Sequence, residues 1–169
     1  MNYEDERRCC YDTKIGNICI GSRGDAIVSL RFNAKDCEYP TEEEETAATR
    51  KAHRQLTEYL EGVRRNFDLD LKPQGGSLFQ RRIWMALLDI PFGHTVSYAQ
   101  LAVTLGNKNA TRAVGGACGK NPIAIFIPCH RVIRSDGSIG GYSGGLAIKE
   151  YLLGTEGVHF DGGVCENVG

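Results

Sequence analysis

Residues 97–122, "SYAQLAVTLGNKNATRAVGGACGKNP", predict two short helices joined by a glycine-containing turn. A Ser-x-x-Gln capping box opens the first helix, and Gly106 is placed to end it in the left-handed conformation. Asn109 is a candidate cap for the second helix, which must end near Asn121 because a proline follows. Such a pair is a helix-turn-helix signal, but most helix pairs only pack against each other, so the pair alone leaves DNA binding open.

The second helix of this pair carries unusually little side chain. Its three glycines each cost about 1 kcal/mol relative to alanine, so a close contact must compensate. Either another part of the protein packs tightly there, or the backbone of a nucleic acid approaches. Arg112 is the long side chain on this bare surface, and it is either a probe inserted into DNA or an ordinary surface arginine.

The first part of the chain has the pattern of a small α+β unit. Two stretches rich in Ile and Val, near 14–20 and 26–32, flank the turn-forming "GSRGD" and predict a β-hairpin. Residues 44–61 lack Gly and Pro and predict a helix, and "NFDLDL" (66–71) alternates with the period of a half-buried strand. The segment "KPQGGS" at 72–77 then marks a domain boundary.

The expected fold is therefore α+β with two domains. Residues 1–76 form a scaffold of antiparallel sheet plus helix, and residues 77–169 form a mainly helical domain with the helix-turn-helix. In this second domain we expect a capped helix at 78–88, a buried strand at 123–128 in "IAIFIP", and a last helix at about 146–153.

Charge is unevenly distributed along a chain whose formal net charge is -1. Residues 79–149 carry eight basic and two acidic side chains, a net +6, whereas the first 78 residues carry 12 basic and 15 acidic ones, including the acidic run at 42–45. The basic stretch is compatible with polyanion binding through one face, and an ordinary mixed surface is the alternative. No apolar run is long enough to cross a membrane and the N-terminus is too charged for a signal peptide, so we expect an intracellular protein.

The seven cysteines are irregularly spaced. An intracellular protein normally keeps its cysteines reduced, so we expect no disulfide. Zinc sites need clustered Cys and His ligands, whereas Cys9 and Cys10 are the only close cysteines here and the histidines are scattered. We therefore expect no metal site.

Cys129 lies in "IPCHRVIRSDGSIGGYSGG", residues 127–145. It follows a proline and has His130, Arg131 and Arg134 nearby, which are groups that favour the thiolate over the thiol. A thiolate attacks carbon, but a lone cysteine is also a common small core residue. The residues alone leave a functional and a structural role open.

His130 is not expected to hydrogen-bond Cys129 directly, because neighbouring side chains of an extended chain point to opposite faces. A water molecule could relay the proton, and Glu156 is a candidate to orient His130. The glycine-rich loop at 135–145 exposes backbone groups to a flat polar ligand, with Tyr142 available for stacking. It lacks the pattern of a phosphate-binding loop.

Several ordered motifs between Phe79 and Glu156 resemble those of the O6-alkylguanine-DNA alkyltransferases, also called methylated-DNA protein-cysteine methyltransferases. They are "FQRRIW", "IPFGHTVSYAQLA", "ATRAVGGACGKNP", "IPCHRVI" and "GGYSGGLAIKEYLL". The resemblance implies DNA repair by irreversible, single-turnover transfer of an alkyl group from O6-alkylguanine to Cys129, after the base flips out of the duplex. It implies no cofactor and a monomer that binds double-stranded DNA through the minor groove. The compartment would be the cytoplasm in a prokaryote and could be the nucleus in a eukaryote.

The resemblance also implies roles for individual residues. Cys129 would accept the alkyl group, with His130 as its water-relayed base and Glu156 orienting that histidine. Asn121 would tie the recognition helix to the active-site segment, and Tyr98 would rotate the nucleotide's phosphate and donate a proton toward the departing guanine. The DNA-contacting residues would be Ala110, Thr111, Arg112, Ala113 and Gly115, and the guanine pocket would be lined by the backbone around Val132, Tyr142 and Ser143.

Two further implications concern the recognition helix and the alternatives. Arg112 would fill the gap left by the flipped nucleotide, and Thr111 stands where the family usually has a smaller residue.

An alkyltransferase-like protein that binds the lesion without chemistry would lack the acceptor cysteine, which is present here. A thiol hydrolase using Cys129 and His130 would need an oxyanion arrangement that the sequence does not offer.

Overall fold

The computed structural model describes residues 6–33 and 45–165, and the chain divides into two compact units. The first unit comprises Met1–Gln74 and Pro122–Phe126, and the second comprises Gly75–Asn121 and Ile127–Gly169. The chain thus leaves the second unit for a short stretch just before Cys129. Cys37 and residues 42–44 of the acidic run lie outside the described residues.

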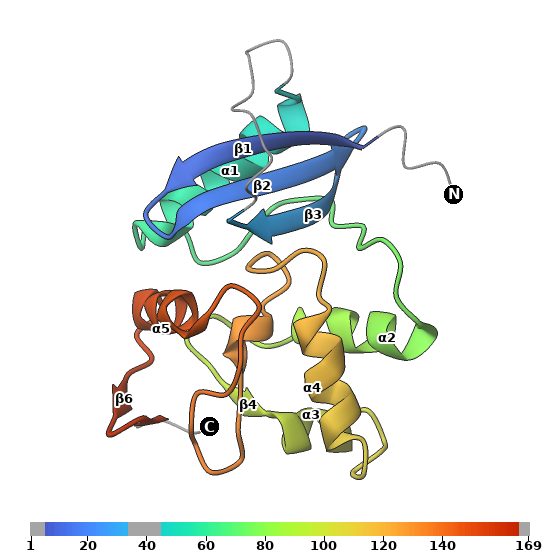
Figure 1. Cartoon of the computed structure of the whole chain (residues 1–169), viewed down its shortest axis with the longest axis vertical. Coiled ribbons are helices and arrows are strands. Elements are labelled where there is room, and N and C mark those ends of the chain that lie inside the picture. Colours follow the sequence, from blue (N-terminus) through green and yellow to red (C-terminus); the bar gives the residue numbers. More distant parts are fainter. Residues whose placement is uncertain (1–5, 34–44, 166–169) are drawn as a thin grey trace. The chain divides into compact units, whose positions relative to one another are not determined.

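The first unit is built on a three-stranded antiparallel sheet in the order β1-β2-β3 (Figure 1). Its strands are β1 (Arg7–Thr13), β2 (Gly16–Arg23) and β3 (Ala26–Phe32). The predicted hairpin is β2–β3 and is confirmed. The sequence did not predict β1, because its two buried residues, Cys9 and Cys10, are adjacent rather than alternating.

Cys10 and Cys19 lie directly opposite each other across β1 and β2 and form a disulfide. The expectation of no disulfide is therefore wrong. The pairing depends on the register of two strands, one of which the sequence did not predict, and directly opposite residues of an antiparallel pair lie within reach of each other. The free cysteines among the described residues are Cys9, Cys118, Cys129 and Cys165, all of them buried.

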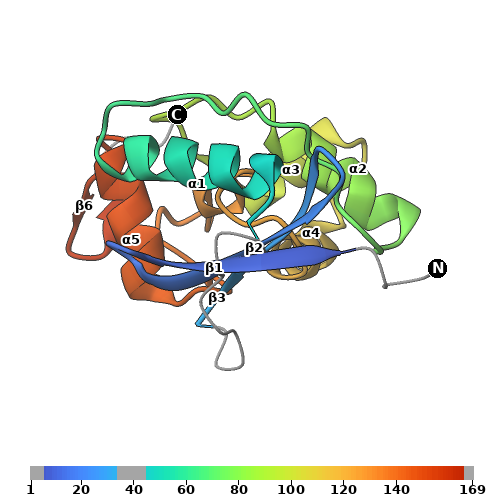
Figure 2. The ribbon, with the colours of Figure 1, turned by 90° about the horizontal axis from the view of Figure 1, so that it is seen from above.

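Helix α1 (Ala47–Leu60) packs across one face of this sheet (Figure 2). Thr46 caps it with a capping box to Thr49, and Gly62 follows in the left-handed region with a φ of 76°. Leu56 on its inner face is fully buried. The helix predicted at 44–61 is confirmed with shorter bounds, since it begins after its cap at Thr46 and ends at Leu60; residue 44 lies outside the described residues.

The segment 66–71 does not form the predicted strand. It makes one isolated bridge to the sheet, between Ile27 and Leu71. Gln55 of α1 replaces a strand partner: the Asp68 N–H donates to Gln55 Oε1 at 2.8 Å, and Gln55 Nε2 donates to the Asp68 carbonyl at 3.2 Å. The alternating burial is present, but Gln55 holds the backbone at Asp68, and the segment bonds to the sheet only at its end, where Ile27 pairs with Asp70 and Lys72.

The strand predicted at 123–128 is also absent. The Leu30 N–H donates to the Pro122 carbonyl at 2.9 Å, and one bridge joins Leu30 to Ile123. Ile125 then adopts a φ of 72°, which interrupts an extended chain. The apolar run is buried, as predicted, but burial alone does not distinguish a strand from an irregular segment.

The second unit is mainly helical, with two small sheets. β4 pairs in parallel with β5, β6 pairs antiparallel with β7, and a single 3-10 turn spans Cys129–Arg131. None of the helices within 6–33 and 45–165 is long and apolar enough to cross a membrane. The elements are α2 (Leu78–Leu87), β4 (Val96–Ser97), α3 (Tyr98–Thr104), α4 (Thr111–Gly119), β5 (Val132–Ile133), α5 (Leu146–Thr155), β6 (Phe160–Asp161) and β7 (Val164–Cys165).

The helix ends follow the sequence with one exception. Ser77 and Ser97 form the predicted capping boxes of α2 and α3, and Gly106 has a φ of 81° after α3. Helix α4, in contrast, begins without a side-chain cap. Asn109 is not its cap, because its backbone N–H donates to the side chain of Asn107 at 3.2 Å and the helix begins two residues later.

Trp84 fixes α2 against α4 in the core of this unit. Its indole Nε1 donates to the Ala117 carbonyl at 2.8 Å, and the side chain is buried. Gly76 allows this packing, because a Cβ there would collide with the Trp84 ring. The inner face of α4 is thereby held in place, and its glycine-rich outer face is left exposed.

We expect Gln55→Met to lower the free energy of unfolding by about 1–3 kcal/mol, because it leaves the Asp68 N–H and C=O without their protein partner. Urea unfolding followed by circular dichroism measures the change. Gln74→Met is the matched control: it removes an exposed hydrogen bond to the Lys72 carbonyl and a long one of 3.4 Å from Arg23, and it should change stability by less than about 0.5 kcal/mol. Equal effects in the two variants would contradict the role given to Gln55.

Candidate active site

Cys129 opens onto a pocket of about 450 Å³ in the second unit. This volume lies within the range of small-molecule sites. The pocket is formed by the start of α3, one side of α4, the turn that carries Cys129, and the loop after β5. Its lining residues are Tyr98, Gly115, Cys118, Gly119, Cys129, Arg134, Gly141, Tyr142 and Ser143.

Asn121 connects the end of α4 to the segment that carries the thiol. Its Nδ2 lies 3.1 Å from Cys129 Sγ and donates to the Ile127 carbonyl at 2.8 Å. The thiol is only 4% exposed. One amide thus fixes the position of the sulfur and gives it a hydrogen-bond donor.

The pKa of Cys129 is set by opposing effects. Burial raises it, while the hydrogen bond from Asn121 and the positive charge of Lys149 lower it. The sequence pointed instead to His130, Arg131 and Arg134 as the groups that favour the thiolate. That hypothesis is wrong for Arg131, because its guanidinium is bound to Glu156.

Lys149 is a site residue that the sequence did not predict. It is fully buried on α5, and its Nζ donates to the carbonyls of Val132 at 2.7 Å and Gly141 at 3.1 Å. Burial lowers its pKa to about 8, although the neighbouring thiols act in the opposite direction. The available signal was its spacing: Lys149 precedes Leu152 and Leu153 by three and four residues, on the buried helix face.

Glu156 is the hub of a buried cluster next to the thiol. His130 Nε2 lies 2.8 Å from its Oε1, Arg131 donates to it through Nε and Nη2 at 2.9–3.1 Å, and the Gly93 N–H donates to its Oε2 at 2.8 Å. Arg131 Nη1 also donates to the Ile90 carbonyl at 2.6 Å. The Arg131 guanidinium is therefore bound to the Glu156 carboxylate.

The cluster fixes the protonation of both titratable members. Burial raises the pKa of Glu156, but the hydrogen bonds from His130 and Arg131 and the charge of Arg131 act against burial and hold the pKa at about 2. Burial lowers the pKa of His130 more than Glu156 raises it, so the imidazole is neutral. With Nε2–H donating to the carboxylate, the basic lone pair of His130 lies on Nδ1.

Tyr98 stands at the pocket wall on the first residue of α3. Burial raises its pKa to about 12, so the phenol keeps its proton at neutral pH. The loop after β5 approaches it closely at Gly140, where a Cβ would lie 3.2 Å from Tyr98 Oη and where φ is 73°. Tyr142 and Ser143 of this loop line the pocket, whereas Val132 is buried and binds Lys149 through its carbonyl.

The outer surface of α4 is bare in the structure too. Added Cβ atoms at Gly116 and Gly119 would meet no atom within 4 Å, so no described part of the protein packs on them. Arg112 and Ala113 are exposed, and Ala110 and Thr111 are half-buried. Of the two explanations for these glycines, close internal packing is therefore not the one that the described residues support.

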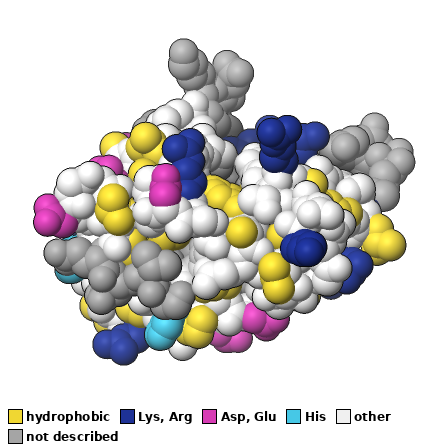
Figure 3. Space-filling view, turned by 90° about the horizontal axis from the view of Figure 1, so that it is seen from below, with side chains coloured by type: hydrophobic (Ala, Val, Ile, Leu, Met, Phe, Trp, Pro, Cys, Tyr) yellow, Lys and Arg dark blue, Asp and Glu magenta, His cyan; other side chains and the backbone are white. Residues whose placement is uncertain are grey.

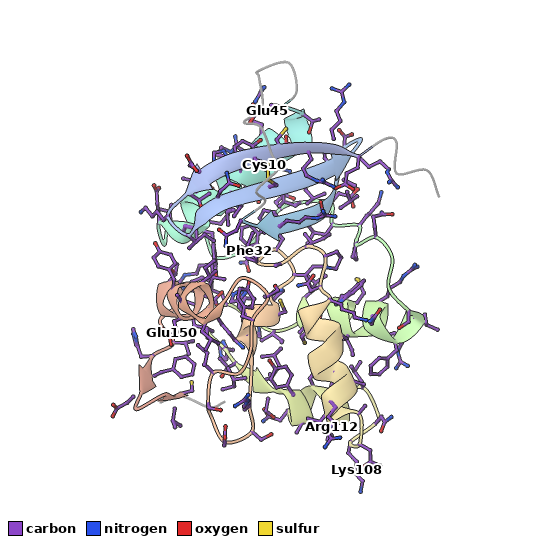
Figure 4. All side chains as sticks on the ribbon, viewed as in Figure 1. Cys10, Phe32, Glu45, Lys108, Arg112 and Glu150 are labelled. Carbon is purple, nitrogen blue, oxygen red and sulfur yellow. A yellow bond between two sulfur atoms is a disulfide. The ribbon has the colours of Figure 1, made fainter. Side chains whose placement is uncertain are left out.

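Arg112 lies at the N-terminal end of α4, and Lys108 lies in the loop before it (Figure 4). Both side chains point away from the body of the unit and are exposed. The face seen from below carries separate Lys, Arg, Asp and Glu side chains around a broad, mainly uncharged centre (Figure 3). Within the described ranges, no group of three or more His, Cys, Asp and Glu is arranged to hold a metal ion.

Comparison with known proteins gives matches over both units. Residues 78–158 match the family "6-O-methylguanine DNA methyltransferase, DNA binding domain", and residues 7–73 match "6-O-methylguanine DNA methyltransferase, ribonuclease-like domain". The methylated-DNA–protein-cysteine methyltransferase of Methanosarcina barkeri is 45% identical over 148 residues, which cover 86% of this chain and 93% of that protein. The constitutive enzyme of that name from Bacillus subtilis is 38% identical, over 88% of this chain and 94% of its own.

Solved structures give a similar result. The crystal structure of Mycobacterium tuberculosis OGT in complex with DNA superposes with a TM-score of 0.79 at 39% identity, covering 89% of this chain and 92% of that one. The O6-methylguanine methyltransferase of the same organism gives 0.78 at 38% identity, with the same coverage. The fold of a small antiparallel sheet followed by a mainly helical unit is thus shared with these proteins.

The Glu156 cluster predicts a dependence of stability on acid. A carboxyl whose pKa is about 2 in the folded protein instead of 4.5 stabilises the fold above pH 4.5 and loses that contribution as pH falls toward 2, a loss of about 3 kcal/mol. Glu156→Gln should lose about 3–5 kcal/mol at pH 7, because Arg131 is left buried without its partner, and should lack this acid-dependent loss.

Urea unfolding between pH 7 and pH 2.5 measures both effects. Glu150→Gln removes an exposed carboxylate from helix α5, which Glu156 ends (Figure 4), and is the matched control, with a curve close to that of the original protein. Parallel pH curves for the original protein and Glu156→Gln would refute the assignment.

Proposed function

The chain belongs to the 6-O-methylguanine DNA methyltransferase family, and from this membership we propose that Cys129 accepts an alkyl group from the O6 position of guanine. The activity is DNA repair by alkyl transfer to a protein cysteine, and the protein binds DNA. The acceptor, the lesion and the mode of DNA binding are proposals that rest on the residues of the second unit.

The position of the Cys129 thiol carries the proposal. It opens onto the 450 Å³ pocket, and Asn121 donates to its sulfur. Cys118 lines the same pocket, but burial and the proximity of Cys129 raise its pKa to about 12. Burial raises the pKa of Cys129 as well, but Cys129 has the hydrogen bond from Asn121, which lowers its pKa and fixes its sulfur. We therefore take Cys129 as the nucleophile.

The reaction is a single displacement. His130, neutral and oriented by Glu156, takes the Cys129 proton through a bridging water. The sulfur then forms a bond to the alkyl carbon while the bond between that carbon and guanine O6 breaks, and the electron pair of that bond leaves with the base. Tyr98, which keeps its proton at neutral pH, donates toward the departing guanine. The product is a thioether that water does not hydrolyse, so each molecule acts once and needs no cofactor.

The DNA is held by the helix-turn-helix of α3 and α4. The bare surface of α4, with Ala110, Thr111, Ala113 and Gly115, enters the minor groove, where small side chains let the helix approach the sugar-phosphate backbone closely. Arg112, exposed at the start of α4, fills the gap left by the flipped nucleotide. Extruding the base costs a few kcal/mol, least for a damaged pair. We expect a monomer to act on each lesion.

The test of the acceptor is to mix the protein with duplex DNA that carries O6-methylguanine and to map its peptides by mass spectrometry. We expect one methyl group per protein, on the peptide that contains Cys129. Cys129→Ser should accept none, and Cys118→Ser should still accept one. Binding of the duplex without methylation would indicate a lesion-binding protein, and many turnovers per protein would exclude a single-use acceptor.

Lys149 should shift the pH dependence of transfer. Lys149→Met removes the charge that lowers the pKa of Cys129, so the profile of rate against pH should move to higher pH. The rate at pH 7 should fall about tenfold for each unit of that movement. Lys149→Arg keeps the charge and is the matched control, and thermal unfolding checks that both variants are folded. An unshifted profile in folded Lys149→Met would refute the electrostatic role.

A further inference from the structure

The basic side chains around the pocket are used in different ways. Arg131 is bound to Glu156, and Lys149 is bound to two backbone carbonyls. Arg134, in the loop after β5, is exposed, and in the described parts of the chain its guanidinium makes no ion pair or hydrogen bond. Of the described residues that line the pocket, Arg134 is also the one with a charged side chain.

The backbone at Arg134 is held firmly although its side chain is not. Its N–H donates to the Ser138 carbonyl at 2.9 Å, and its carbonyl accepts from the Gly137 N–H at 3.0 Å. Asp136, an acidic neighbour of its charge, is itself exposed and accepts two hydrogen bonds from Ser138, at 2.6 and 2.9 Å. The guanidinium thus projects from a fixed turn with its donors facing solvent.

Gly140 places Arg134 next to Tyr98. A Cβ on Gly140 would lie 3.6 Å from Arg134 Cγ and 3.2 Å from Tyr98 Oη, so these two side chains flank the same backbone position. The charge of Arg134 acts on the phenol, lowering a pKa that burial raises. The arginine therefore stands at the part of the pocket rim where Tyr98 lies.

A flipped base brings its own anions to this rim. When the base fills the pocket, its sugar and the adjoining phosphates stay outside, at the mouth. A guanidinium with unused donors suits a phosphate well, because its fork of N–H groups matches two phosphate oxygens. We propose that Arg134 binds a backbone phosphate next to the extruded nucleotide and holds that nucleotide at the pocket mouth. This inference rests on the proposed function, since it requires a flipped base in this pocket.

The experiment compares two substrates of the same Cys129. Duplex DNA with O6-methylguanine has phosphates, whereas the free base O6-benzylguanine has none. We expect Arg134→Gln to lower the rate constant with the duplex about tenfold at low salt, as one charge-assisted contact is worth. The rate with the free base should fall far less, since only the small effect of the charge on Tyr98 is lost there. The slope of log rate constant against log salt should become shallower by about 0.9, the value for one lost phosphate contact.

Arg54→Gln is the matched control, because it removes the same charge from an exposed position on α1 and from no part of the pocket lining. It should change neither the rates nor the salt slope. An equal loss with duplex and free base would show that Arg134 acts on the base or on pocket structure, and an unchanged salt slope would show that it meets no phosphate. Either result overturns the proposal while leaving transfer to Cys129 intact.

The phosphate itself can be located by neutralising the positions that flank the lesion one at a time with methylphosphonate. At the position that Arg134 contacts, the modification should slow the original protein but not slow Arg134→Gln further. Additive losses at every flanking position would overturn the proposal. If the original protein transferred no alkyl group to Cys129 from either substrate, the proposed function itself would fail, which is a separate outcome.

Discussion

The buried carboxylate of Glu156 is the interaction on which the site depends. A charge without solvent is costly unless every oxygen is satisfied, and Glu156 meets this condition by joining the end of α5 to the Gly93 loop and to the turn that follows Cys129. Arg131 is thereby withdrawn from the thiol and His130 is oriented, while burial keeps the imidazole neutral against the effect of the carboxylate. The thiol is instead influenced by Asn121, which donates a hydrogen bond to it, and by the positive charge of Lys149.

How far the sequence predicts this site depends on the type of contact. The capped helices α2 and α3 follow from Ser77 and Ser97, because a capping box is local. Cys129 stood out through its neighbours, yet the use of Arg131 was not predictable. Its partner Glu156 lies 25 residues away, and nothing in the spacing shows that Arg131 binds this carboxylate and not the Cys129 sulfur.

The two strands predicted wrongly share a cause. Periodicity reports which side chains are buried, and it does so correctly for 66–71 and 123–128. It does not report what the backbone is bonded to. Gln55 supplies the bonds at Asp68 in the middle of the first segment, and a left-handed Ile125 interrupts the second. The disulfide between Cys10 and Cys19 was missed for a related reason, since it depends on strand register.

The basic side chains of residues 79–149 fall into a buried group and an exposed group. Two of its eight basic side chains, Arg131 and Lys149, are buried and satisfy a carboxylate and two carbonyls, so they are not available to DNA. The other six are exposed. The net charge of a segment therefore overstates the positive charge available to a polyanion, because it includes buried cations that are already bound within the fold. Arg134 is the exposed basic side chain that lines the pocket. For this reason we expect it, and not Arg131 or Lys149, to bind a phosphate there.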